Sequence, residues 1–217
     1  MFGKFADWRR YRILQREIDQ QYGIDTQARV GIEQLSASGP NVGYAYDYLP
    51  SPALWFDRIV GQLPIKMSDY VFVDLGSGKG LALIRAARFG FKRVIGVELG
   101  ENLYQIALSN MAKLQQREET ARSIEIILGD AAEFQFPSDS LVLYLYNPFG
   151  PEVVRKVLSN LETSLSAHPR SCWIVYVNPL HHEIFEDCGF LRTHTAKLRT
   201  DTGEPFALYT LITTTRS

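Results

Sequence analysis

The sequence predicts an α/β fold: a seven-stranded, mostly parallel sheet with helices on both faces and an antiparallel hairpin at its C-terminal end. Three observations predict it. After about residue 70, strand-length segments rich in β-branched residues alternate with helix-length amphipathic segments, as in successive βαβ units. The last two strand-length segments have no helix between them, which is typical of antiparallel neighbours. The chain has 217 residues, of which 46% are hydrophobic, and this is enough for one buried core.

The chain divides at about residue 70. We expect residues 1–70 to form an N-terminal helical cap or lid segment, and residues 71–217 to form the domain that contains the sheet. Apolar side chains recur at helical spacing across residues 6–21, and a loop rich in Gly, Pro and Tyr covers residues 39–52. A short helix is expected after this loop, at residues 53–62.

Strands and helices alternate in the second segment. We expect strands at residues 71–75, 93–98, 123–128, 140–146, 172–177, 190–198 and 205–213. We expect helices at residues 80–89, 101–116 and 151–165. Because a parallel neighbour needs a long crossover, strands that are joined through a helix are expected to pair in parallel. The turn at residues 199–203 is expected to close the terminal antiparallel hairpin.

Composition and charge exclude several classes of protein. The 23 Lys and Arg against 24 Asp and Glu give a net charge of -1, so the chain has no cationic excess to hold a polyanion and no strong nucleic-acid signal. Cys172 and Cys188 lack CxxC spacing, which indicates a reducing compartment, so we expect a cytoplasmic location. No segment approaches the roughly 20 apolar residues of a membrane span, so no membrane partner is expected.

A glycine-rich loop follows the first predicted strand, in the segment VFVDLGSGKG. Ligands of open parallel sheets bind outside the carboxyl ends of the strands, and glycines let the backbone approach a ligand closely. Three details argue against a dinucleotide or a P-loop phosphate site: the spacing is GxGxG, Asp74 precedes Gly76 by two residues, and Lys79 is not followed by Ser or Thr. A carboxylate at this position suits a ligand with an ammonium group.

Two further strand ends carry carboxylates. Glu98 ends the second strand, where a carboxylate can accept hydrogen bonds from both hydroxyls of a ribose. Asp130 follows the third strand in the segment ILGDAAEF, where it can accept from the exocyclic amine of adenine while the Ala131 N–H serves a ring nitrogen. These groups predict a nucleoside ligand with a cationic tail and no phosphate.

These motifs, in this order, resemble those of the class I S-adenosylmethionine-dependent methyltransferases over residues 70–215. With the YGIDT segment at residues 22–26, the chain is most similar to a set of bacterial methyltransferase-domain proteins. The resemblance implies a Rossmann-like sheet, S-adenosyl-L-methionine as cofactor and methyl transfer as activity. It implies cofactor contacts at Asp74, Gly76, Ser77, Gly78, Gly80, Glu98, Leu99, Asp130, Ala131 and Asn147.

The fourth strand ends in Tyr146-Asn147-Pro148-Phe149, from which we expect the catalytic residues to come. This segment resembles the Asn-Pro-Pro-aromatic motif of methyltransferases that act on planar or amine nitrogens, with Phe149 in place of the second proline. A partial likeness to the non-SET histone lysine methyltransferases also covers the glycine loop and this segment. The Asn147 and Pro148 carbonyl oxygens would accept N–H bonds from an acceptor amine, and Tyr146 or Phe149 would form the pocket wall.

The acceptor is expected to be a nitrogen nucleophile of a protein, on lysine or an amide-like group. RNA or a small molecule is the enzymatic alternative, and a non-catalytic cofactor-binding scaffold subunit is the alternative outside enzymes. Asn178 could line the same cleft as Asn147, and the tyrosine-rich lid could touch cofactor or substrate. Lys79 is expected to be a solvated side chain, and no metal site is expected because the pair His181-His182 lacks a third ligand.

Overall fold

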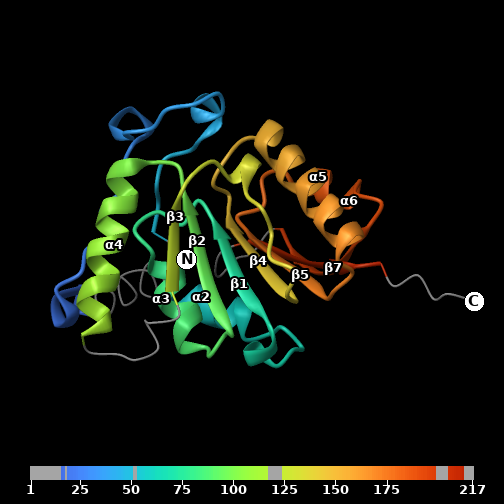
Figure 1. The fold of residues 1–217 in the computed structure, drawn as a ribbon, viewed down its shortest axis with the longest axis horizontal. Coiled ribbons are helices and arrows are strands. Elements are labelled where there is room, and N and C mark those ends of the chain that lie inside the picture. Colours follow the sequence, from blue (N-terminus) through green and yellow to red (C-terminus); the bar gives the residue numbers. More distant parts are fainter. Residues whose placement is uncertain (1–15, 18, 51–52, 117–123, 199–204, 213–217) are drawn as a thin grey trace, which may run out of the picture.

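The computed structural model describes residues 16, 17, 19–50, 53–116, 124–198 and 205–212 (Figure 1). The helix expected at residues 6–21 falls mostly outside the described residues, although its last part, at residues 19–22, is helical. No helix in the described part of the chain is long and apolar enough to span a bilayer.

Seven strands form one sheet in the order β3-β2-β1-β4-β5-β7-β6. The strands are β1 (Val71–Leu75), β2 (Arg93–Glu98), β3 (Ile124–Leu128), β4 (Leu141–Tyr146), β5 (Cys172–Val177), β6 (Leu191–Lys197) and β7 (Phe206–Leu211). β1 to β5 pair in parallel, and β7 is antiparallel to both β5 and β6. The expected fold class is therefore confirmed, including the antiparallel hairpin.

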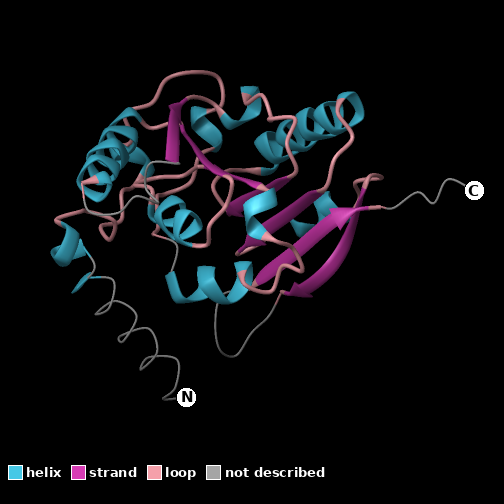
Figure 2. Cartoon of the chain, turned by 60° about the horizontal axis from the view of Figure 1, so that its bottom comes forward, coloured by secondary structure: helices cyan, strands magenta, loops and turns pink. Residues whose placement is uncertain are grey.

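Helices cover both faces of this sheet (Figures 1 and 2). The α-helices are α2 (Ala53–Val60), α3 (Leu81–Arg88), α4 (Glu101–Gln115), α5 (Pro151–Ala167) and α6 (His182–Glu186). Short 3-10 turns are η1 (Ile32–Gln34), η2 (Val42–Tyr44), η3 (Met67–Asp69) and η5 (Ala131–Glu133). The helix α6 is not among the predicted ones, because five residues are too few to show a helical period.

The strand sequences explain the two-sided core. All residues of β1 and β5 are buried, as expected of central parallel strands covered on both faces. Alternate side chains enter opposite cores: Val73 packs with α5 and α6, whereas Phe72 packs with α2 and α3. The helix α2 therefore belongs to the core although it precedes residue 70, and a domain boundary at residue 70 stays a prediction.

Residues 30–50, which precede α2, lie over the carboxyl ends of the strands, where they appear in lighter blue at the top of Figure 1. Single antiparallel bridges join Val30 to Tyr48 and Ala45 to Phe149. The amide of Asn102, in the first turn of α4, accepts from the Ser36 N–H at 3.1 Å. These contacts place the segment where ligands bind in an open parallel sheet.

Candidate functional site

The glycine loop between β1 and α3 is shaped by two close approaches. Gly76 and Gly78 have φ of +83° and +54°, which residues with a Cβ rarely adopt. A Cβ on Gly76 would lie 2.5 Å from Cβ of Pro148, and one on Gly78 would lie 2.1 Å from the ring of Tyr48. Glycine at these positions therefore lets the loop touch both the β4 end and the N-terminal segment.

Glu98, the last residue of β2, is held by the same loop. Its Oε2 accepts the Gly78 N–H at 2.7 Å, and its Oε1 accepts the Gly100 N–H at 2.8 Å. Burial raises the pKa of Glu98, and these N–H bonds partly oppose the rise because they stabilise the charged form. The Leu99 N–H opposes the rise in the same way, so three backbone donors surround this carboxylate.

Asp74, in β1, faces the cleft with 3% of its surface exposed. Burial raises the pKa of Asp74 well above its usual range, and the charge of Glu98 raises it further. No donor among the described residues opposes this rise. A buried carboxylate of this kind is stabilised when a ligand brings a cation or a donor.

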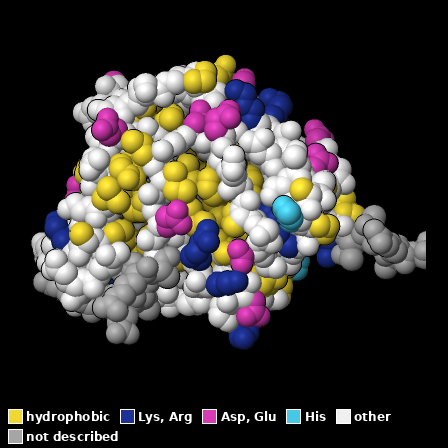
Figure 3. Space-filling model, in the orientation of Figure 1, with side chains coloured by type: hydrophobic (Ala, Val, Ile, Leu, Met, Phe, Trp, Pro, Cys, Tyr) yellow, Lys and Arg dark blue, Asp and Glu magenta, His cyan; other side chains and the backbone are white. Residues whose placement is uncertain are grey.

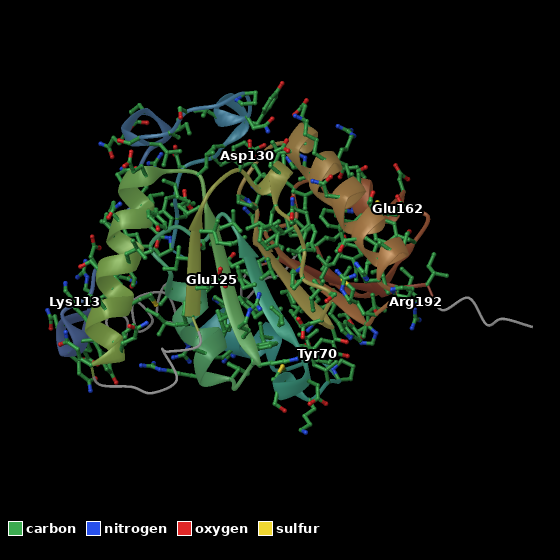
Figure 4. The ribbon with its side chains drawn as sticks, viewed as in Figure 1. Tyr70, Lys113, Glu125, Asp130, Glu162 and Arg192 are labelled. Atoms are coloured by element: carbon green, nitrogen blue, oxygen red, sulfur yellow. The ribbon has the colours of Figure 1, made fainter. Side chains whose placement is uncertain are left out.

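Asp130 caps the turn η5 and also contacts Asn41, which the sequence does not predict. Its Oδ1 accepts the Ala132 N–H at 2.9 Å, and its Oδ2 accepts from the Asn41 amide at 2.7 Å. The Asn41 Oδ1 in turn accepts from Lys156 at 2.9 Å. Figure 4 shows Asp130 at the carboxyl edge of the sheet, beneath the N-terminal segment. The lid therefore reaches the carboxylate that was expected to hold adenine.

One cleft collects most of the expected cofactor residues. Its empty volume, which includes space open to solvent, is about 880 Å³. The expected residues that line it are Asp74, Gly76, Ser77, Glu98, Leu99, Asp130, Ala131, Tyr146, Pro148 and Phe149. Gly78 and Gly80 lie behind this wall, the first under Tyr48 and the second against Met111.

Asn147 lines an adjoining pocket instead. Asn178, at the end of β5, lines it too, and both asparagines have left-handed backbones, with φ of +41° and +48°. Tyr46 and Tyr146 line both the cleft and the pocket. Asp47 and exposed apolar side chains, among them Leu180, also line this pocket.

The β4 end is also held by the lid. The Pro148 carbonyl accepts the Tyr46 N–H at 3.1 Å, and the Gly150 N–H donates to the Tyr44 carbonyl at 2.8 Å. One lone pair of the Pro148 oxygen is thus used within the chain, by the backbone of the N-terminal segment. Phe149 is buried, lines the cleft, and forms the antiparallel bridge to Ala45.

The expectation that Lys79 is a solvated side chain is wrong. Its side chain is 2% exposed, and its ammonium bonds both oxygens of Asp25, at 2.9 and 2.8 Å. The Asn110 amide donates to the carbonyls of Asp25 and Lys79. The sequence shows no sign of this contact, because its members are separated by 31 to 85 positions.

Substitution of Asp25 by Ala is expected to reduce the free energy of unfolding by about 2 kcal/mol. The change leaves Lys79 buried without its counter-ion, and Asp25 itself is half-exposed, which reduces the cost below that of a fully buried pair. Lys79→Met removes the buried charge and keeps the volume, so it should cost less than Asp25→Ala. Urea unfolding of both variants is the measurement, and an equal or larger loss in Lys79→Met would contradict this prediction.

Comparisons with known proteins agree with the fold. A family model described as histone methylation protein DOT1 matches residues 53–124. A curated relative from Methanosarcina mazei, a probable ribosomal RNA small subunit methyltransferase A, is 35% identical over 105 residues, which is 48% of this chain and 35% of the relative. The chain thus spans about a third of that relative's length.

Two solved structures share the arrangement over three quarters of this chain. One is an RNA methyltransferase from Salinibacter ruber in complex with S-adenosyl-L-homocysteine, with 24% identity, a TM-score of 0.54, and coverage of 75% of this chain and 94% of that chain. The other is a putative tRNA (m1A22) methyltransferase from Streptococcus pneumoniae, with 16% identity, a TM-score of 0.54, and coverage of 75% and 70%.

The expectation of a protein acceptor without a strong nucleic-acid signal is corrected by these findings. The curated relative and both solved structures are named as RNA methyltransferases. The physical reason for the error is that a net charge of -1 is an average over the whole chain, which does not report on the surface around one pocket.

The strand order, the glycine loop after β1 and the solved structures lead to one conclusion. The chain has the class I S-adenosylmethionine-dependent methyltransferase fold.

Proposed function

We propose that this chain is an S-adenosylmethionine-dependent methyltransferase that methylates a nitrogen atom of an RNA base. The observation that carries the proposal is a cleft with carboxylates at three successive strand ends that adjoins a pocket with two amides. Tyr146 lines both, so a methyl group held in the cleft would face an acceptor held beside Asn147.

The cleft residues fit the cofactor. Asp74 would receive the ammonium group that its buried carboxylate lacks. Glu98, which the backbone N–H groups of the glycine loop hold at the end of β2, would accept from ribose hydroxyls. Asp130 would accept from the adenine amine, either beside or in place of the Asn41 amide.

Alignment is the main task of the acceptor side. The cofactor supplies an electrophilic methyl group on sulfur, and transfer is an in-line displacement that depends on the geometry of the acceptor. Asn147 Oδ1 would accept a hydrogen bond from an N–H group of the base and direct its nitrogen toward the cleft, and the methylated nitrogen would then release its proton to water. The ring face of Tyr146 would favour the positive charge that develops on that nitrogen.

Support for RNA comes from the relatives and from the pocket chemistry. Amides and aromatic rings are the groups that bind a base taken out of its stack, through hydrogen bonds and stacking. On the face shown in Figure 3, Lys and Arg side chains are interspersed with Asp and Glu. The proposal therefore assigns recognition of the base to the pocket, which residues of the lid between positions 45 and 49 help to line.

The direct test is transfer of a labelled methyl group. Total RNA from a strain of the source organism that lacks this gene is incubated with tritiated S-adenosylmethionine and the purified protein. We expect label that nuclease releases and protease does not, located on a base nitrogen by nucleoside analysis. Label released only by protease, or absence of S-adenosylhomocysteine binding in calorimetry, would overturn the proposal.

Substitution of Asn147 by Ala is expected to lower the rate of methyl transfer by at least about 100-fold, because the acceptor nitrogen is no longer aligned with the methyl group. Binding of S-adenosylhomocysteine should change little, since Asn147 lies outside the main cleft. Asn147→Gly is the matched control, because glycine tolerates φ of +41° and also lacks the amide. Normal transfer by the Gly variant would show that the amide has no role.

A further inference from the structure

The hydroxyl group of Tyr176 forms a hydrogen bond with the Asn147 amide. Tyr176 is in β5, next to the strand that ends at Asn147, and its Oη donates to Asn147 Oδ1 at 3.0 Å. Tyr176 is fully buried, and in the sequence it is one apolar-type residue within a buried strand. Nothing in the motifs around it indicates a polar task.

A second hydrogen bond, from the backbone of His181, determines that Tyr176 is the donor to Asn147. The His181 N–H points to the Tyr176 Oη at 3.4 Å, and a backbone N–H can only donate. The Tyr176 oxygen is therefore an acceptor on that side, and its own proton is free for Asn147. Burial raises the pKa of Tyr176 far above its usual value, so the hydroxyl keeps this proton at any physiological pH.

The same histidine is held by the lid. The hydroxyl of Tyr46 and Nε2 of His181 are 3.1 Å apart, and the two rings are stacked. Tyr46 lines both the cleft and the acceptor pocket. A continuous set of contacts thus runs from the pocket wall through His181 and Tyr176 to the Asn147 amide.

A fixed amide matters for the proposed transfer. The oxygen and nitrogen ends of an Asn side chain are nearly the same shape, so packing alone does not decide which end faces the acceptor. A donor on one lone pair of Oδ1 fixes the orientation of the amide. The second lone pair of Oδ1 then also points in a fixed direction. An acceptor N–H bound there would be aimed in a constant way.

We propose that Tyr176 is a positioning residue that acts through Asn147, by fixing the orientation of its side-chain amide at the acceptor pocket. The inference rests on the proposed function, since it assigns Tyr176 a part in acceptor alignment. Tyr176 does not itself line the cleft or the pocket. Its removal should therefore affect the rate of transfer and leave cofactor binding unchanged.

Tyr176→Phe is the test, and Tyr209→Phe is the matched control. Both tyrosines are buried and both rings pack against Phe185. The Tyr209 hydroxyl has no hydrogen-bond partner among the described residues, so its loss should leave transfer unchanged. For Tyr176→Phe we expect kcat to fall about tenfold, as for one lost hydrogen bond, with the KM for S-adenosylmethionine unchanged.

A double-mutant cycle separates positioning from general damage. In the Asn147→Gly background, Tyr176→Phe should lower the remaining rate by less than about twofold, because the group it acts through is absent. An independent readout is the side-chain amide NMR signal of Asn147, assigned by its loss in Asn147→Gly. This signal should shift in Tyr176→Phe and stay in place in Tyr209→Phe.

Each outcome has one meaning. If the unsubstituted protein transfers no methyl group to the total RNA, the proposed function fails, and the NMR signal still tests the contact. If transfer is normal and Tyr176→Phe retains full kcat, the positioning role is refuted. Equal losses in Tyr176→Phe and Tyr209→Phe, or a full tenfold loss in the Asn147→Gly background, would refute it as well.

Discussion

Substitution of Asp74 by Asn is expected to weaken binding of S-adenosylmethionine by about 100-fold, the usual scale for loss of one member of a buried charge pair. The variant removes the carboxylate that we assign to the ammonium group and keeps its size. Calorimetry with S-adenosylhomocysteine, which has the same ammonium group, is the measurement. Asp69→Asn, at an exposed position on η3, is the control and should bind normally.

The same variant is expected to be more stable without ligand. Because burial and Glu98 raise the pKa of Asp74 above that of the unfolded chain, the folded state binds a proton more tightly. The free energy of unfolding therefore falls as the pH rises from the ordinary carboxyl pKa of about 4 to the raised value. Asp74→Asn removes this loss and should gain about 1 kcal/mol near neutral pH, or about 3 °C in Tm.

Thermal unfolding of the unliganded protein between pH 5 and pH 8 checks the sign. The Tm of the unsubstituted protein should decrease with pH more steeply than that of Asp74→Asn, while some dependence from Glu98 remains in both. Parallel Tm profiles would contradict the assignment of a raised pKa to Asp74. Normal ligand affinity in the variant would contradict its assignment to the ammonium group.

Substitution of Gly78 by Ala is expected to cost about 3 kcal/mol of stability and to reduce ligand affinity at least tenfold. The change adds backbone strain at φ of +54° and drives a Cβ into the ring of Tyr48, which lines the cleft and donates to the Thr26 carbonyl. The displaced ring would open the cleft wall.

Gly90→Ala is the matched control for this prediction. Gly90 also has a positive φ, of +76°, but a Cβ there would meet nothing within 4 Å. It should cost about 1 kcal/mol from strain alone and leave affinity unchanged. Urea unfolding and calorimetry with S-adenosylhomocysteine distinguish the two effects. Equal losses of stability and equal ligand affinities in Gly78→Ala and Gly90→Ala would show that the contact with Tyr48 does not contribute.

The sequence predicts the central strands with accurate bounds, because their side chains are buried on both faces and their patterns are strong. The bounds of β1, β2 and β5 are as expected. Elements with weak local signals are less well predicted. α6, with only five residues, was not expected, whereas the edge strand β6 was expected within one residue at each end.

The candidate site divides in the same way. Residues at strand ends, such as Asp74, Glu98 and Asp130, can be found from the sequence, because the sequence pattern indicates where each strand ends. The carboxyl ends of parallel strands then lie at one edge of the sheet. Asn41 and Tyr176 could not be found, because their contacts join segments 89 and 29 positions apart and no local pattern encodes them.

The sequence by itself determined the fold class, the order of the strands along the chain, and the set of carboxylates at the ligand-binding edge. These depend on local hydrophobic period and on residue type next to a strand end. Only the tertiary structure decided that Lys79 is buried against Asp25, that Asn41 contacts Asp130, and that the Tyr176 hydroxyl donates to Asn147. Such contacts form when distant segments pack together, and their energy depends on burial and direction that the linear sequence does not contain.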